Sequence, residues 1–401
     1  MSHDHADHEQ FGLDESGLFD RRSLLKIGAA AAGAAAITGF GEAPANAASW
    51  SDKLGTLKIG YLPITDASPL LIAHARGFLQ NNGVSVDKPT LFRSWPSIAE
   101  AFAAKQVDIV HLLMPLAMQL KFDAKQDIKV IAWNHTDGSA LTVAKSINGV
   151  GDLSGKTVAI PFWYSVHNVI LQQILRKNGL NAITTGDANA AKKEVKVIVL
   201  APADMPPALA SGKVSGYIVA EPFNALAEVN GIGKILRFSG DVWKDHACCV
   251  TVVRGDLVKN NPEAAQVIAD SIAKSQLWLT QERASAATWL APYLPQAPAA
   301  ITKALNDYGS QYNGTAIQHQ AWNIDRIGFQ PFPYPTYTTE LVKQLRLTTV
   351  DGDITWLKKI NLKTVHTDLV SSKFIQSSIT RLGGFVKFGQ KGPSRVETIA
   401  P

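Results

Sequence analysis

A strand-and-helix pattern that occurs twice is the strongest constraint on the fold of this 401-residue chain. Residues 101–115, AFAAKQVDIVHLLMP, and residues 208–222, ALASGKVSGYIVAEP, share a helix end, a strand and a terminal proline. Strands that alternate with helices in this way are typical of parallel strand–helix–strand units. The sequence therefore predicts two similar α/β lobes, with Met114 and Glu221 at corresponding strand ends.

The remaining strand candidates extend both lobes. LKIGYLP and VSVDKPTLF precede the first repeat and IKVIAWNH follows it, while GKTVAI and VKVIVLAP precede the second repeat. After residue 257 the chain becomes mainly helical. We therefore expect an α/β, two-lobed fold with a helical C-terminal section. Its ligand cleft should lie between the lobes, at the carboxyl ends of the strands.

The same order of elements predicts where the chain divides. Lobe one is discontinuous, because the chain leaves it to form lobe two and then returns. The expected bounds are a signal peptide at 1–47, lobe one at 55–145 plus 249–385, lobe two at 146–248 and a C-terminal tail at 386–401.

The first 47 residues have the composition of an export signal. Arg21-Arg22 precedes an alanine-rich apolar run, and Ala45-Asn46-Ala47 supplies a small-x-small cleavage site. This order is typical of a twin-arginine signal peptide, and the apolar run is too short for a permanent membrane span. An uncleaved anchor is the alternative. We expect an exported protein that is soluble in the periplasm after cleavage.

Charge and cysteine content narrow the function further. Residues 1–47 carry three Lys/Arg and seven Asp/Glu, so their removal moves the net charge from +5 to +9. A positive balance favours anionic solutes or surfaces. Cys248 and Cys249 are adjacent, and neighbouring strand residues point to opposite faces, so we expect two buried thiols. CxxC and zinc-ligand spacings are absent, so the sequence predicts no metal site and no cofactor.

Six segments carry a family resemblance. They are KIGYLPITDASPLLIAHARGFL, SWPSIAEAFAAKQVDIVHLL, DLSGKTVAIPFWYSVHN, SGYIVAEPFN, WKDHACCVTVVRGDLVKNNP and GFQPFPYPTYTTELVKQL. In this order they resemble periplasmic solute-binding proteins of the nitrate/sulfonate/taurine/bicarbonate family, which is related to thiamine-pyrimidine binding proteins. The resemblance implies a type II periplasmic-binding-protein fold that closes on a solute and delivers it to an ABC permease.

The stretch PFWYSVHN, residues 161–168, is one predicted wall of the cleft. Ser165 is placed to cap a helix whose free backbone N–H groups attract anions, with His167 beside them. The alternative is a structural cap and a structural histidine. Trp163 and Tyr164 either line the cleft or belong to the core.

Lobe one supplies the facing wall. Trp95 lies at the corresponding strand-to-helix junction, and Met114 lies at a strand end. The family resemblance implies that Thr65, Asp66 and Ser68, in the turn after the first strand, contact the solute. Capping of the following helix would by itself explain Ser68.

Glu221 determines which charge the ligand should carry. An acid in the cleft suits an ammonium group, an amine-bearing ring or a metal ion, and it opposes a bare anion. Alternatively, Glu221 forms a salt bridge across the hinge or caps backbone groups. His246 is expected at the hinge, at the cleft rim or in an exposed loop. His74 and His111 fall within a helix and a strand, so we interpret them as structural.

We therefore expect a non-enzymatic periplasmic binding component of an ABC importer. Its solute is small and anionic or zwitterionic, of the nitrate, sulfonate/taurine or bicarbonate class, and binding closes the hinge. The expected partners are this solute and the permease and ATPase subunits, with no nucleic acid, and the chain is expected to be a monomer. The alternative is a pyrimidine (thiamine-precursor) binding protein or a related biosynthetic enzyme, with His167, His246 and Cys248 as its reactive candidates. A ligand sensor for a membrane receptor is a third possibility.

Overall fold

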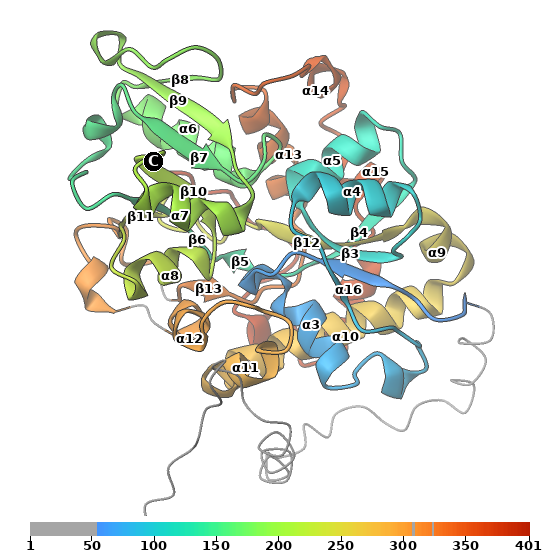
Figure 1. The fold of residues 1–401 in the computed structure, drawn as a ribbon. Helices are drawn as coiled ribbons and strands as arrows, with labels where there is room; N and C mark the ends of the chain where they lie inside the picture. The colour runs from blue at the N-terminus through green and yellow to red at the C-terminus, as the bar shows by residue number, and fades with distance from the viewer. Residues whose placement is uncertain (1–53, 307–308, 323–324) are drawn as a thin grey trace, which may run out of the picture. The chain divides into compact units, whose positions relative to one another are not determined.

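The computed structural model describes residues 54–306, 309–322 and 325–401, all within the unit Ala43–Pro401. Two β-sheets, each covered by helices, form most of this unit (Figure 1). The predicted signal peptide and its cleavage site lie outside the described residues. In the described part of the chain, no helix is both long enough and apolar enough to cross a membrane.

The first sheet has the strand order β2-β1-β3-β12-β4. Its strands are β1 (Ile59–Tyr61), β2 (Thr90–Leu91), β3 (Ile109–Leu113), β4 (Ile128–Trp133) and β12 (Cys249–Arg254). Strand β1 runs parallel to β2 and β3, whereas β12 runs antiparallel to β3 and β4. All five residues of β3 are buried, as expected for a strand covered on both faces.

The second sheet has the strand order β11-β6-β10-β7-β9-β8. Its strands are β6 (Ser139–Val143), β7 (Thr157–Ile160), β8 (Asn181–Ile183), β9 (Glu194–Val199), β10 (Gly216–Ala220) and β11 (Lys234–Phe238). Parallel pairing joins β10, β7, β9 and β8, while β6 runs antiparallel to both β10 and β11. The prediction of parallel units thus holds for most of both sheets and fails for β6 and β12.

The exceptions are the strands that follow the two passages between the sheets. The chain leaves the first sheet after β4 through residues 134–138, which we call the outbound crossing. It returns from β11 to β12 through residues 239–248, the return crossing. The predicted boundary between residues 145 and 146 is therefore wrong, because β6 already pairs within the second sheet.

Helices follow the strand ends as the sequence pattern predicts. In lobe one they are α3 (Ser68–Ala75), α4 (Trp95–Ala103) and α5 (Met114–Phe122), and in lobe two α6 (Val166–Lys177), α7 (Met205–Ala210) and α8 (Phe223–Val229). Met114 directly follows β3 and Glu221 directly follows β10, so the repeat places them at corresponding strand ends.

The C-terminal section is helical, as predicted, and packs on both lobes. Its helices are α9 (Gly255–Asn260), α10 (Pro262–Gln281), α11 (Arg283–Leu290), α12 (Pro298–Asn306), α13 (Pro335–Leu345), α14 (Thr355–Lys359), α15 (Val365–Leu369) and α16 (Lys373–Arg381). Helix α10 packs on α3 and α16, while α12 packs on α8 (Figure 1). The short strand β13 (Ile327–Gly328) pairs with β5 (Thr136–Asp137) of the outbound crossing. The section therefore contacts the connection between the sheets as well as the sheets' helices.

Candidate functional site

One edge of the first sheet gathers a set of buried polar side chains. Asp66 lies in the turn after β1, and His135 lies in the outbound crossing, just after β4. Cys249 begins β12, and Cys248 precedes it. Because β12 is antiparallel to β3 and β4, its first residue lies at the edge where those strands end, and Cys249 pairs with Leu113, the last residue of β3. Residues far apart in the sequence are thereby brought together.

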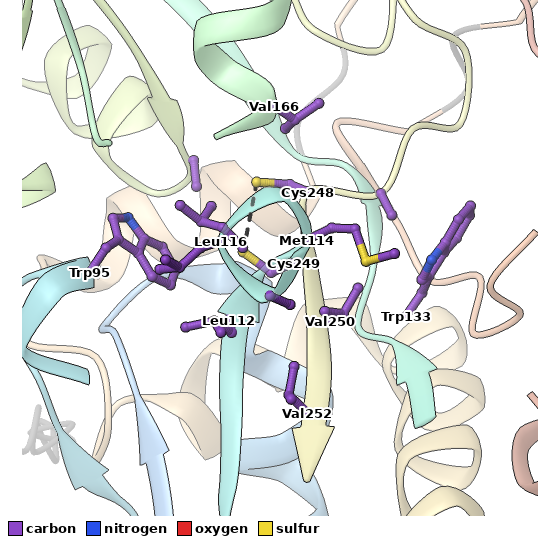
Figure 2. Packing of buried hydrophobic residues seen from close by; sticks show 14 of the residues in the cluster. Trp95, Leu112, Met114, Leu116, Trp133, Val166, Cys248, Cys249, Val250 and Val252 are labelled. Carbon is purple, nitrogen blue, oxygen red and sulfur yellow. Dashed lines mark hydrogen bonds between the residues drawn. The ribbon is translucent and has the colours of Figure 1, made fainter. Parts of the chain in front are cut away.

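These four side chains, which we call the Cys–His–Asp group, lie close together and are fully buried. One ligand atom of each lies within 4.8 Å of those of the other three. His135 Nε2 lies 2.8 Å from Asp66 Oδ2. The Sγ atoms of Cys248 and Cys249 are 3.7 Å apart and face each other in Figure 2.

The two thiols correct one detail of the sequence prediction. Cys248 and Cys249 are free and buried, as expected. They do not point to opposite faces, because Cys248 lies before β12 and is not bound by the alternation of a strand. Figure 2 shows their sulfur atoms among apolar side chains that include Leu116, Met114 and Val166.

The electrostatics of the group favour an ion pair. Burial raises the pKa of Asp66 to about 6, against the opposing effect of His135. Burial lowers the pKa of His135, but the charge and hydrogen bond of Asp66 outweigh it and raise this pKa to about 10. Near neutral pH the pair is therefore mostly carboxylate and imidazolium.

Burial and neighbouring groups also shift the pKa values of the two thiols and of the nearby imidazoles. Burial raises the pKa of both thiols, but the hydrogen bond from Cys249 and the charge of His167 bring the pKa of Cys248 well below its usual value. The pKa of Cys249 stays well above it. Burial lowers the pKa of His111 and of His246 to about 3, so both imidazoles are neutral.

Lobe two contributes His167 to this region. Ser165 caps α6 as predicted, accepting a hydrogen bond of 3.1 Å from the backbone N–H of Asn168. His167 is the second residue of α6. Its Nε2 lies 2.9 Å from the Ser139 hydroxyl and 3.8 Å from Cys248 Sγ. His167 is buried, and its contact with Cys248 places it at the junction of the two lobes, beside the return crossing.

His246 lies close to the same junction. It is fully buried in the return crossing, which excludes the exposed-loop interpretation. Its Nε2 lies 2.8 Å from the Ser239 hydroxyl, and that hydroxyl donates to the backbone carbonyl of Ser139. Ser139 also contacts His167, so a chain of polar contacts connects the two predicted histidines.

Three buried residues of lobe one have unused polar atoms: Ser68 and Trp95 begin helices, and His111 lies in β3. Ser68 is the first residue of α3 rather than its N-cap, so capping does not explain it. The Ser68 hydroxyl, Trp95 Nε1 and both ring nitrogens of His111 have no hydrogen-bond partner among the described residues. The Trp95 and His111 rings are neighbours, with centroids 5.6 Å apart. The interpretation of His111 as structural leaves both of its nitrogens unexplained.

Other predicted site residues have structural partners. Thr65 donates through its backbone N–H and its hydroxyl to the Glu221 carbonyl, at 2.8 and 3.0 Å, and so joins the two lobes. Met114 is buried in the hydrophobic core, and Trp163 is half-buried and packs against that core. The Tyr164 hydroxyl donates to the Asp353 carbonyl, so this ring faces the C-terminal section rather than the polar group.

Glu221 adopts its predicted alternative role. Its Oε1 lies 2.6 Å from Arg326 Nε, and its Oε2 accepts a hydrogen bond from the backbone N–H of Ala225. Both charged side chains are fully buried. Glu221 is therefore satisfied within the protein, which removes the argument for a cationic group on the ligand.

Sequence reasoning missed several members of this region. Local spacing did not indicate His135, the two cysteines as a group, or Arg326. The available signal was positional: His135 and Cys249 lie directly at strand ends, where side chains converge at the edge of a sheet.

Comparison with known proteins places the chain in a family. A family model described as the NMT1-like family matches residues 52–291, well over half of the chain. The chain belongs to the NMT1-like family. This NMT1-like chain is similar to the nitrate/nitrite binding protein NrtA of Nostoc sp. PCC 7120, to which it is 26% identical over 242 residues. That match covers 55% of this chain and 53% of NrtA, so the chain spans about half the length of this relative.

Solved structures confirm the predicted periplasmic-binding-protein fold for this member of the NMT1-like family. The periplasmic nitrate-binding protein NrtA from Synechocystis PCC 6803 has a TM-score of 0.71 at 18% identity, covering 86% of this chain and 93% of that one. The ligand binding component of an ABC-type import system from Staphylococcus aureus, solved with zinc bound, has a TM-score of 0.64 at 24% identity. It covers 80% of this chain and 98% of that one.

Proposed function

We propose that this chain is the solute-binding component of an ABC importer, and that its solute is small and anionic or zwitterionic. Its family, its likeness to nitrate-binding proteins and its fold support this role. By that likeness, nitrate, sulfonate or taurine, and bicarbonate are the classes to test. The permease and ATPase of the importer would be its partners.

The observation that carries the proposal is the set of unused polar atoms at two helix starts and in strand β3 of lobe one. Buried polar groups in folded proteins are almost always hydrogen-bonded. The Ser68 hydroxyl, Trp95 Nε1 and His111 have no such partners among the described residues, and all three side chains are buried. Each of these groups has a donor, namely the hydroxyl, the indole N–H and the one N–H of the neutral His111 ring, and a donor requires an acceptor such as the oxygen of an anion.

The charged side chains of this region are paired with one another, so the unused donors rather than a net charge favour an anion. His135 carries a positive charge near neutral pH because its pKa is raised to about 10, and Asp66, whose pKa of about 6 leaves it mostly ionised there, balances that charge. Glu221 is neutralised by Arg326, so it no longer argues against an anion. The region therefore offers unused donors, and Glu221 of lobe two adds no free negative charge to them.

Hinge motion at the two crossings would let the solute reach this buried region. The lobes are joined there by the outbound and return crossings, and by the contact of Thr65 with the Glu221 carbonyl. A few residues that absorb backbone rotation suffice for such closure. Solute that binds the closed form better would shift the population toward it, and the permease would recognise that form.

A thermal-shift screen tests this function directly. The protein is heated alone and with nitrate, nitrite, bicarbonate with and without Ca²⁺, taurine, alkanesulfonates or pyrimidines. A specific ligand present at about 100 times its Kd stabilises the folded state by about 2.7 kcal/mol and raises Tm. A rise with one anion class supports the proposal, and a rise with pyrimidines alone supports the alternative ligand class.

An enzyme is the second candidate, because the structure brings its predicted residues together. Cys248 Sγ lies 3.8 Å from His167 Nε2, which is the kind of pairing that activates a thiol nucleophile. Turnover of a pyridoxal-type compound by the purified protein, lost in Cys248→Ser, would replace the transport proposal with this one. Binding without turnover would exclude it.

The proposed location is the periplasm, after removal of the twin-arginine signal. N-terminal sequencing of the protein recovered from the cell envelope tests this. A mature N-terminus at Ala48, just after the predicted Ala45-Asn46-Ala47 cleavage site, supports the proposal, and an intact Met1 on membrane-bound protein supports an uncleaved anchor.

A further inference from the structure

The Cys–His–Asp group has the composition of a metal site. Two sulfur atoms, one imidazole and one carboxylate supply four ligand atoms, all within 4.8 Å of one another. Zn²⁺ in proteins is typically held by four such ligands in a tetrahedron, with Zn–S distances of about 2.3 Å. Two thiolates on one zinc ion are then roughly 3.8 Å apart, and the Sγ atoms of Cys248 and Cys249 are 3.7 Å apart.

We propose that Asp66, His135, Cys248 and Cys249 bind one metal ion of the Zn²⁺ class. The proposal concerns an ion rather than the transported solute, so it stands or falls separately from the importer function. Its ligands are also distinct from Ser68, Trp95 and His111, which carry the solute proposal.

The ligand types select the metal. Thiolates are soft ligands, which bind zinc in preference to Mg²⁺, Ca²⁺ or Mn²⁺, because those ions favour carboxylate, carbonyl and water oxygens. A site with two sulfur atoms therefore excludes the hard cations as its main occupants. Zinc is redox-inert, and its binding needs only deprotonation of the ligands.

Burial makes an ion the natural partner of the group. All four side chains are fully buried, and Asp66 Oδ1 and His135 Nδ1 have no hydrogen-bond partner in the described ranges. Buried carboxylates and thiolates are costly unless a cation compensates them. A bound ion would supply that charge. On His135 Nε2 it would replace the 2.8 Å contact with Asp66 Oδ2 and the 3.3 Å hydrogen bond that this nitrogen accepts from the Cys249 backbone N–H.

The position of the ligands has a mechanical consequence. None of the four comes from residues 139–238, which form the second sheet. They lie on the first sheet and on the two crossings, so metal binding does not depend on closure of lobe two. His167 of lobe two approaches Cys248 Sγ to 3.8 Å without being one of the four ligands. The ion would therefore stay bound in the open form and fix the end of the return crossing.

Metal titration of the full chain tests the proposal. The protein is kept reduced with a phosphine, its two free thiols are verified chemically, and Zn²⁺ is added in competition with a chromophoric chelator. We expect one zinc per chain after desalting. Co²⁺ should bind the same site and give thiolate-to-cobalt absorption in the near ultraviolet. Because the site is buried, a second sample is unfolded and refolded with Zn²⁺, which removes access as a barrier.

Matched variants identify the ligands. Cys248→Ser, Cys249→Ser and His135→Gln should each weaken zinc binding by about 100-fold or more, and each serine variant should lose about half of the thiolate-to-cobalt absorption. The control is His74→Gln, since His74 lies in α3 and contacts Tyr293 instead. Circular dichroism verifies that each variant folds. Failure of both samples to bind zinc would overturn the proposal, as would cysteine variants that bind within twofold of the parent chain.

Discussion

Ser68 and Trp95 begin helices α3 and α4, and both are buried with an unused donor. At such positions most residues of this kind use their polar atoms within the protein. The Trp95 ring is a neighbour of the His111 ring, whose nitrogens are unused as well. At the scale of single residues they are the clearest sign that something outside the chain completes the site.

The first prediction concerns these two donors. Ser68→Ala and Trp95→Phe should each weaken binding of the identified solute by about 5–10-fold, the loss of one hydrogen bond. Ser68→Ala should not destabilise the ligand-free protein by more than about 1 kcal/mol, because no internal hydrogen bond is lost, whereas Trp95→Phe should cost about 1–2 kcal/mol more because the smaller ring leaves a cavity in the core. Isothermal titration and denaturant unfolding measure the two effects. Ser211→Ala, on the exposed end of α7, is the control. Unchanged affinity in both variants would contradict the site assignment.

A second residue-scale prediction concerns pH and His366 of α15. Its Nδ1 contacts the Thr338 hydroxyl at 2.9 Å, and burial lowers its pKa to about 4, with a smaller effect of Lys129. The folded-state pKa lies below the unfolded value of about 6.5, so the unfolded chain binds more protons between these values. Stability should therefore be complete above pH 6.5 and should fall as pH drops toward 4.

The burial of His366 determines how much unfolding free energy its protonation removes. A shift from 6.5 to about 4 corresponds to about 3 kcal/mol at most, and partial solvent exposure reduces this to roughly 2 kcal/mol. Urea unfolding at pH 7.5 and 4.5 measures the loss. His366→Gln should lose less stability over this range by about that amount. An equally steep fall in His366→Gln would show that His366 is not the cause.

At the scale of elements, Arg326 connects three parts of the fold. It lies just before β13 and contacts Glu221, after β10, and Glu228 of α8 at 2.6 and 2.9 Å. Both Arg326 and Glu221 are fully buried. The C-terminal section is thereby joined to the second sheet by charges that cannot be solvated in the folded state.

Arg326→Met should therefore be strongly destabilising. Removing one partner of a buried ion pair leaves an uncompensated charge and costs about 3–5 kcal/mol. The double variant Arg326→Met, Glu221→Gln should recover part of this loss. Lys343→Met is the control, because its exposed contact with Glu340 is worth only about 0–1 kcal/mol. Chemical unfolding gives each value, and a loss below 1 kcal/mol in Arg326→Met would refute the role of the pair.

Elements were more predictable from the sequence than their junctions. The repeat at 101–115 and 208–222 placed strands and helix starts, and the N-cap of Ser165 followed from local chemistry. The partner of Glu221 did not, since Arg326 lies 105 residues away. The proximity of His135 and Cys248 did not follow from local chemistry either, because it depends on which strand is antiparallel. Local pattern determines elements, whereas pairing of distant strands determines the site.

At the scale of the whole molecule, the two crossings unite the proposals. The outbound crossing contributes His135, and the return crossing contributes His246 and Cys248. Any change at this junction affects both the hinge and the buried polar region. We expect the solute to favour a closed form, since its donors lie on lobe one and His167 approaches from lobe two.

The most direct test of the central claim is isothermal titration of the reduced, full-length chain with the anion that raises Tm most in the screen. The proposal predicts one binding site per chain, with affinity lowered about 5–10-fold in Ser68→Ala and unchanged in Ser211→Ala. X-ray scattering of the same samples should show a smaller radius of gyration with solute. Absence of binding by every anion and zwitterion tested would contradict the account.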